Sequence, residues 1–344
     1  MVIPKAYVRS GSLLSDLVML LIGLGIILMS AEVFTNGVEW LGKRLHLGAG
    51  AVGSVLAAVG TALPETMVPI IAFWGMGGGD TAEVGIGAIL GAPFMLITLA
   101  FFISGAAVLI FRRNNKPLFI NTAVIKRDLS FFLLVYSLAI FASFLPTREL
   151  KLAVAALLPL LYISYVIKTV RNSLGTEDHD HLAPLYFAQR KTNPSLFIIL
   201  TQLMFALSGM VAGAHAFVDA VQSVAQATGI PALVLSLIIT PVATELPEKF
   251  NSVIWLKRGK DTLALGNITG AMVFQSSTIP ALGIALTTWQ LEPLALWSAI
   301  LALGSGLFIY ITLRRRGTLC PLHLMMGGGF YLLFIITLLR FPLH

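Results

Sequence analysis

Two copies of a short phrase each place a glutamate inside an apolar stretch of this sequence. The first copy is Val59-Gly60-Thr61-Ala62-Leu63-Pro64-Glu65, and the second is Val242-Ala243-Thr244-Glu245-Leu246-Pro247-Glu248. A carboxylate in hydrocarbon costs roughly 3 kcal/mol or more, so acids within a membrane generally have a function. Hard cations bind to carboxylate, carbonyl and hydroxyl oxygens. The two phrases therefore predict a shared cation site.

The residues before each glutamate supply further oxygen atoms. Thr61 and Thr244 each lie four residues before the glutamate, so their hydroxyls share its helix face. The proline before each glutamate lacks an N–H, and we expect it to break the helix and free carbonyl oxygens around Ala62 and Glu245. Two carboxylates in a low dielectric repel each other unless a cation or a proton lies between them. This competition is the minimal chemistry of an antiporter.

The alternative for Glu65 and Glu248 is that each is satisfied by hydrogen bonds and only braces the fold. Their symmetric recurrence beside a proline favours the functional interpretation, because paired broken helices are typical of a transporter's ion site.

Composition predicts an all-α polytopic membrane protein. The chain has 344 residues, of which 57% are hydrophobic and 11% are charged, whereas soluble domains carry about 25% charged residues. The formal net charge is +7, but the basic residues lie in short loops between apolar runs. This pattern reflects membrane topology and does not indicate a nucleic-acid-binding face. The single Cys320 cannot form an intrachain disulfide.

Apolar runs long enough to cross a bilayer number about ten. They are expected near 13–41, 48–74, 82–111, 128–146, 150–170, 195–226, 230–256, 262–288, 293–313 and 321–341. Most lysines and arginines fall in alternate loops, which the positive-inside rule places in the cytoplasm. The opposite side carries only Lys5, Arg9, Arg148, Lys151 and Arg340. We therefore expect a multi-pass protein of the plasma (inner) membrane with both termini outside.

The two halves of the chain are related to each other. The glutamates are 183 positions apart (248 minus 65), and the same shift places Ala31 on Ala214 and Phe34 on Phe217. Each half holds an odd number of spans, so the second must enter the membrane with opposite polarity, as an inverted repeat. The predicted divisions are a first repeat over 1–170, a cytoplasmic linker over 171–193 and a second repeat over 194–344.

These phrases, together with Gly266-Asn267-Ile268-Thr269-Gly270-Ala271, resemble the alpha repeats of the cation/calcium exchanger superfamily. The resemblance is strongest to the membrane domain of sodium/calcium exchangers, as a divergent member. It assigns the first alpha motif to 48–74 and 82–96, and the second to 230–256 and 262–275. It implies about ten transmembrane helices and alternating access. The ligands it implies are Glu65, Glu248, Thr61, Thr244, Glu245, Gln275 and Ala62, with Lys249 and Asn267 as modulating residues.

The sequence departs from the family pattern at several ligand positions. The serines expected before Leu-Pro-Glu are replaced by Ala62 and Glu245. Further hydroxyl or polar ligands are absent or weakened at Ala92, Leu96, Ala271 and Gln275. Glu245 adds a carboxylate, so the set of oxygen ligands is shifted along the chain.

Lys249 follows Glu248 directly and has two interpretations. Its ammonium could pair with a carboxylate of the site and replace a sodium ion. Alternatively, it extends toward the cytoplasmic loop that holds Lys257.

We expect a secondary cation antiporter like the sodium/calcium exchangers, with Ca²⁺ and Na⁺ or H⁺ as bound ions and no resident cofactor. The alternatives are a proton-coupled exchanger for sodium or another cation, and a non-transporting membrane sensor of the same fold. An enzyme is not expected, because no His-Glu-x-x-His or aspartate-rich diphosphate motif is present. The expected partners are inorganic cations and the lipid bilayer. A monomer or weak homo-oligomer is expected, and residues 177–181 are more typical of a solvated charge run than of a regulatory metal loop.

Overall fold

The computed structural model describes residues 13–44, 63–74, 78–112, 116–173, 183–191 and 193–340, and this part of the chain is helical. The helices are α1 (Leu13–Arg44), α4 (Leu63–Trp74), α5 (Gly78–Met95), η2 (Leu96–Ala100), α6 (Phe101–Arg112), α7 (Thr122–Phe141), η3 (Ala142–Phe144), α8 (Arg148–Ser173), η4 (Tyr186–Ala188), α9 (Leu196–Thr228), α10 (Ala232–Lys257), α11 (Asp261–Leu286), α12 (Pro293–Arg316) and α13 (Pro321–Arg340).

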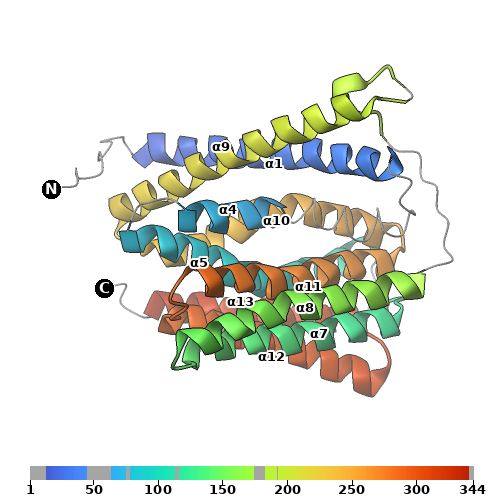
Figure 1. The fold of residues 1–344 in the computed structure, drawn as a ribbon. Coiled ribbons are helices and arrows are strands. Elements are labelled where there is room, and N and C mark those ends of the chain that lie inside the picture. Colours follow the sequence, from blue (N-terminus) through green and yellow to red (C-terminus); the bar gives the residue numbers. More distant parts are fainter. Residues whose placement is uncertain are drawn as a thin grey trace.

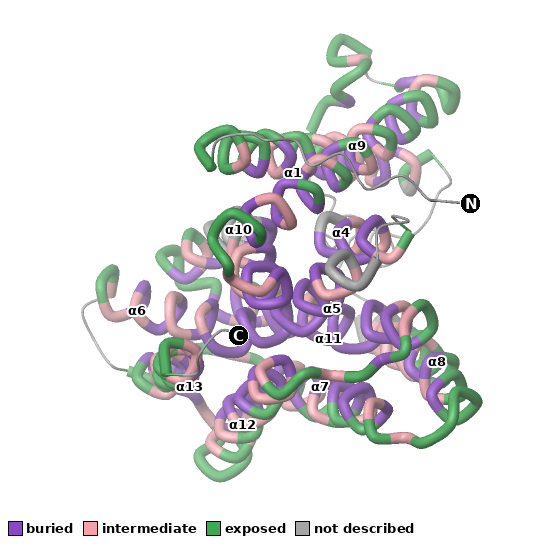
Figure 2. Tube along the Cα trace, turned by 90° about the vertical axis from the view of Figure 1, so that its left-hand side faces the viewer, coloured by how far each residue is buried: buried purple, intermediate pink, exposed green. Residues whose placement is uncertain are grey.

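The helices lie in two parts, which both views of the molecule show (Figures 1 and 2). Helices α1 and α9 pack on each other and form a layer along one side. Helices α5 and α11 occupy the centre of the larger part, where buried residues are concentrated, and α6, α7, α8, α12 and α13 surround them. Helices α4 and α10 lie between the α1–α9 layer and this centre.

Close backbone contact orients α1 and α9 antiparallel. Gly23 of α1 lies against the backbone of Gly213 and Phe217, whereas Gly37 lies against the side chain of Leu203. Residue numbers that rise along α1 therefore fall along α9. Small residues allow helices to approach closely where no water drives them together, as in a bilayer.

Helices α5 and α10 are parallel and equally close. A Cβ atom on Gly87 would meet the backbone of Leu233 and Leu237, and one on Gly91 would meet the Leu237 carbonyl and the Pro241 ring. In addition, the Ser236 hydroxyl donates to the Val84 carbonyl over 2.6 Å. Helix α10, which carries the second phrase, is thereby fixed against the centre of the protein.

The helical run from 78 to 112 contains one irregular turn. Residues Leu96–Ala100 form the π-helix η2 between α5 and α6. A π-turn inserts an extra residue into the helix and is common near functional sites. The predicted span 82–111 is therefore helical throughout, although it is not a regular α-helix.

Seven helices of the described part are long and apolar enough to cross a membrane, and α4 and α10 contribute shorter apolar stretches, Glu65–Trp74 and Ala232–Val242. The protein is therefore a multi-pass membrane protein. Each of the ten predicted spans contains a helix. In three spans, however, the described part of the helix is too short or too polar to cross a membrane. One of these, 128–146, corresponds to α7, which begins six residues earlier at Thr122 and includes three charged residues.

The predicted break at Pro247 is not a gap in the helix. Helix α10 continues from Ala232 to Lys257 across both Pro241 and Pro247. A proline removes one backbone hydrogen bond of a helix, but neighbouring helices in a membrane protein can hold the backbone helical around it. In the first half, α4 begins at Leu63, directly before Pro64, and residues 45–62 lie outside the described part.

Candidate functional site

The first predicted glutamate lies at the start of a buried helix. Glu65 is in the first turn of α4 and its side chain is 4% exposed. A carboxylate is favoured there, because the helix dipole and the first N–H groups of a helix stabilise negative charge. Helix α4 packs on α5, α9, α10 and α11, so Glu65 belongs to the region where both halves of the chain meet.

The second phrase lies in the middle of α10. Thr244 and Glu245 are completely buried, and the Thr244 hydroxyl donates to the Thr240 carbonyl over 3.0 Å. The backbone of Glu248 and Lys249 is helical, whereas their side chains are outside the description. Thr61 and Ala62 lie outside the described residues altogether.

Two hydroxyls that sequence reasoning missed extend the polar face of α10. Ser236 and Thr240 are buried and their oxygens are 3.1 Å apart. Together with Thr244 and Glu248 they recur every fourth residue, so they follow one face of the helix. This spacing was visible in the sequence, but hydroxyls at such spacing also occur where helices merely pack closely.

Helix α11 adds the two amides. Gln275 is 2% exposed, and its Oε1 accepts no hydrogen bond from any described residue. A buried acceptor of this kind is costly unless it binds something. Asn267 is half-buried and donates from Nδ2 to the Ser252 Oγ of α10 over 3.3 Å, which joins α10 to α11. Because α11 packs on α4, α5 and α10, the Gln275 amide belongs to the same helix cluster as both phrases.

Two apolar residues that depart from the family pattern lie on the third predicted span. Ala92 and Leu96 are buried, and Leu96 is the first residue of η2. They contribute no side-chain oxygen, so the described ligand candidates come mainly from α4, α10 and α11. Within the described part of the chain, to which the Glu248 side chain does not belong, no three His, Cys, Asp or Glu residues form a cluster.

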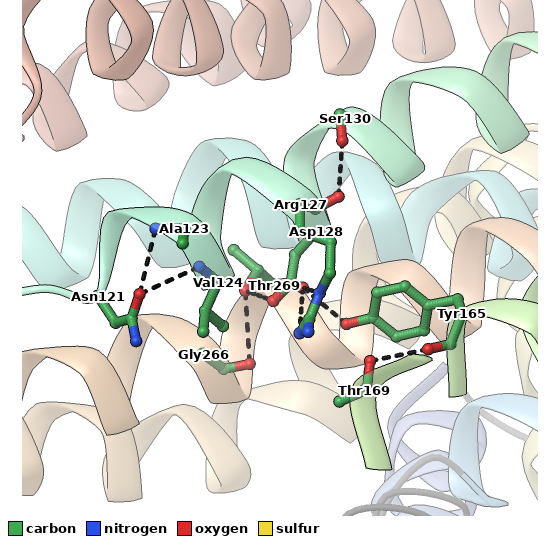
Figure 3. Close-up of polar contacts among 10 residues, drawn as sticks. All are labelled: Asn121, Ala123, Val124, Arg127, Asp128, Ser130, Tyr165, Thr169, Gly266 and Thr269. Atoms are coloured by element: carbon green, nitrogen blue, oxygen red, sulfur yellow. Dashed lines mark hydrogen bonds and ion pairs between the residues drawn. The ribbon is translucent and has the colours of Figure 1, made fainter. Parts of the chain in front are cut away.

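Sequence reasoning missed a buried carboxylate outside the phrases. Asp128 of α7 is 2% exposed and accepts hydrogen bonds from the Tyr165 hydroxyl of α8 and the Thr269 hydroxyl of α11 (Figure 3). Lys126 and Arg127, directly before it, belong to the basic residues predicted to face the cytoplasm, and Asp128 is the first residue of the predicted span 128–146. Only the partners on other helices distinguish it from a loop charge.

Comparisons with known proteins agree with this architecture. The sequence pattern of the family described as sodium/calcium exchanger protein matches residues 15–170 and 198–341. A protein of Alkalimonas amylolytica described as "Putative antiporter CaxA" is 26% identical over 326 residues, which cover 92% of this chain and 98% of that protein.

Two solved structures share the fold. The crystal structure of the H⁺/Ca²⁺ exchanger CAX matches with a TM-score of 0.73 at 18% identity, covering 95% of this chain and 82% of that chain. A structure of the sodium-calcium exchanger NCX_Mj matches with a TM-score of 0.59 at 20% identity, covering 96% of this chain and 100% of that chain. With the family pattern spread over both halves of the sequence, this protein belongs to the sodium/calcium exchanger protein family.

Proposed function

We propose that the protein is a secondary active cation antiporter that binds calcium and a coupling ion at one site between its two halves. The observation that carries the proposal is that buried acids from both phrases lie on helices in mutual contact. Glu65 of α4 is 4% exposed, Glu245 of α10 is fully buried, and α4 packs on α10. Acids in such an environment serve ion transport more often than structure.

The proposal includes two inverted repeats of about five spans each. The antiparallel contact of α1 with α9 supports this arrangement, because the two helices occupy equivalent places in the halves. The parallel contact of α5 with α10 is consistent with it as well. The repeats would bring Glu65 and Glu248 to the site from opposite sides, with Thr61, Thr244, Gln275 and the carbonyl of Ala62 as further ligands.

Charge balance suggests how the site alternates between ions. Glu65, Glu245 and Glu248 carry three negative charges when ionised and Lys249 carries one positive charge, which leaves two. A single Ca²⁺ neutralises that remainder, and so do two monovalent ions. The sodium/calcium exchange expected from the family is thus compatible with the residues of this chain.

A proton-coupled exchanger is the second candidate. The apolar side chains of Ala92 and Leu96 supply no oxygen for sodium, whereas Glu245 adds a buried carboxyl group that can take up a proton. A pair of carboxylates is stabilised by a shared proton as well as by a cation.

The test is calcium flux in proteoliposomes, with sodium, potassium and proton gradients imposed singly. We expect a sodium or proton gradient to drive calcium uptake, and Glu65→Gln and Glu248→Gln to abolish it, because the amide keeps the shape but removes the charge. Glu292→Gln is the matched control, since Glu292 is exposed at the start of α12. Uptake that persists undiminished in both Gln variants, or wild-type protein that moves no cation, would overturn the proposal.

A further inference from the structure

Asp128 is the centre of a closed polar cluster that joins three helices (Figure 3). Its Oδ1 accepts from the Tyr165 hydroxyl of α8 over 2.7 Å and from the Arg127 guanidinium over 3.1 Å. Its Oδ2 accepts from the Thr269 hydroxyl of α11 over 2.8 Å. The Arg127 guanidinium also lies over the Tyr165 ring, 5.1 Å from its centroid.

These contacts distinguish Asp128 from an ion ligand. Both carboxylate oxygens accept hydrogen bonds from hydroxyl groups, and the positive charge of Arg127 balances the negative charge of the carboxylate. Breaking a buried, paired carboxylate network is costly, because the remaining groups lose their partners. The cluster therefore holds α7, α8 and α11 in one fixed relation.

The cluster acts on the side of α11 that faces away from the candidate ligands. Asn267, Ala271 and Gln275 recur every fourth residue and share one face of α11. Thr269 lies two residues from Asn267 and from Ala271, which is about 200° around a helix of 3.6 residues per turn. A hydrogen bond at Thr269 thus determines the rotation at which α11 presents Asn267 and Gln275 to α10.

The ends of α11 are held independently of Asp128. At its first residue, Asp261 forms an ion pair with Arg112 of α6 and accepts from the backbone N–H of Phe119. At its last turn, Arg148 of α8 donates to the carbonyls of Ile284 and Ala285. Loss of the Thr269 contact would therefore leave the helix in place and release only its middle.

We propose that Asp128 is a positioning residue of the transport site, which acts through the Thr269 hydroxyl to set the affinity for the transported cation. The proposal deepens the proposed function and rests on it. The expected effect is on the binding affinity for the cation, because the residues that Asp128 aligns through Thr269 are ligand candidates. The turnover rate depends on motion of the whole site, so a local rotation of α11 affects it less.

The decisive variant is Thr269→Val, which removes the hydroxyl and keeps the shape. We expect the KM for calcium uptake to rise about tenfold, the change that corresponds to losing roughly one hydrogen bond to a charged group, while kcat changes by less than about twofold. Ser277→Ala is the matched control. Ser277 is equally buried on α11, but its hydroxyl donates only to carbonyls of its own helix, so its KM should stay within about twofold of the wild type.

A double-mutant cycle separates positioning from general stability. Asp128→Ala should raise KM at least as much as Thr269→Val, and the double variant should be no worse than Asp128→Ala alone, because both changes remove the same hydrogen bond between Thr269 and Asp128. Asp128→Asn keeps one acceptor oxygen and should recover part of the affinity. A wild-type KM in Thr269→Val, or additive effects in the double variant, would overturn the proposal.

A second readout does not require transport. The calcium or sodium concentration that gives half of the maximal rise in melting temperature of the purified protein should shift upward in Thr269→Val and stay unchanged in Ser277→Ala. Wild-type protein that is stabilised by cations but shows no flux would contradict the proposed function alone. An unshifted midpoint in Thr269→Val would contradict the positioning role alone.

Discussion

At the level of single residues, Lys249 bears on how many ions the candidate site needs. Lys249 follows Glu248 in α10. Basic residues deep within a span are costly and generally pair with acids or line an ion path. If the Lys249 ammonium occupies the place of one monovalent ion, the site needs one fewer ion to balance its carboxylates.

The variant Lys249→Ala tests this role. We expect a steeper dependence of exchange current on sodium or proton concentration and a changed charge moved per cycle, because one more cation must then bind. Lys257→Ala is the control, since Lys257 is exposed at the end of α10, over the Phe111 ring. If the current depends on ion concentration as in the wild type, the result would support the alternative interpretation, in which Lys249 extends toward the cytoplasmic loop.

Two basic residues on the sparsely charged side have a structural explanation. The sequence assigned Arg148 and Lys151 to the outside, against the general excess of basic residues in the cytoplasm. Lys151 is 8% exposed and donates to the Thr288 carbonyl over 2.7 Å, and Arg148 donates to carbonyls at the end of α11. Cations near a helix C-terminus satisfy its last carbonyl groups, so these charges are structural.

Among the elements, helix α13 approaches the π-helix η2 closely at a glycine. A Cβ atom on Gly327 of α13 would collide with the Thr98 carbonyl and contact the Ile97 carbonyl. Both carbonyls are backbone groups, so the backbone itself would have to move to make room for the added Cβ atom. The close approach of α13 to η2 therefore requires glycine at this position.

Substitution in the run Gly327-Gly328-Gly329 gives a matched pair. We expect Gly327→Ala to destabilise the protein by roughly 1–3 kcal/mol, the usual cost of overpacking. Gly329→Ala is the control, because nothing lies within 4 Å of its Cβ position and alanine favours the helix by up to about 1 kcal/mol. The check is the melting temperature of the purified protein. Equal melting temperatures for the two variants would show that α13 does not pack tightly on η2.

The ends of several helices follow from local chemistry. The Asn121 side chain accepts from the N–H groups of Ala123 and Val124 and starts α7 (Figure 3). Helices α9 and α12 end at Gly229 and Gly317, which have φ angles of 70° and 69°. Glycine adopts this left-handed conformation without steric cost. Such signals explain why predicted spans such as 195–226 and 293–313 agree with α9 and α12 within a few residues.

At the scale of the whole molecule, the distribution of charge predicts the orientation in the membrane. Exposed Arg314, Arg315 and Arg316 end α12, on the side that we expect to face the cytoplasm. Thr147, which precedes α8, is exposed and should lie outside.

Cysteine labelling tests this orientation. In a Cys320→Ala background, Thr147→Cys should react with a membrane-impermeant maleimide in intact cells, whereas Arg315→Cys should react only after permeabilisation. Two such positions on opposite sides follow from the alternating basic loops. If Arg315→Cys reacted in intact cells and Thr147→Cys did not, the orientation would be the reverse of the predicted one. If both variants reacted equally in intact cells, the predicted number of spans between the two positions would be wrong.

The amino-acid sequence alone indicates the membrane class and most helix positions, and it contains the two glutamate phrases. These features are local, because apolar length, proline, glycine and charge act within a few residues. The same local reasoning predicted a break at Pro247, whereas α10 continues across it, since neighbouring helices support the backbone of a membrane helix.

The partners of Asp128, in contrast, follow only from the way the helices pack. In the sequence it adjoins Lys126 and Arg127 and resembles the end of a loop, but in the fold it bonds to Tyr165 and Thr269. Those residues are 37 and 141 positions away along the chain. A polar side chain in a low dielectric takes its role from its partners, and partners so distant in sequence become neighbours only when the helices pack.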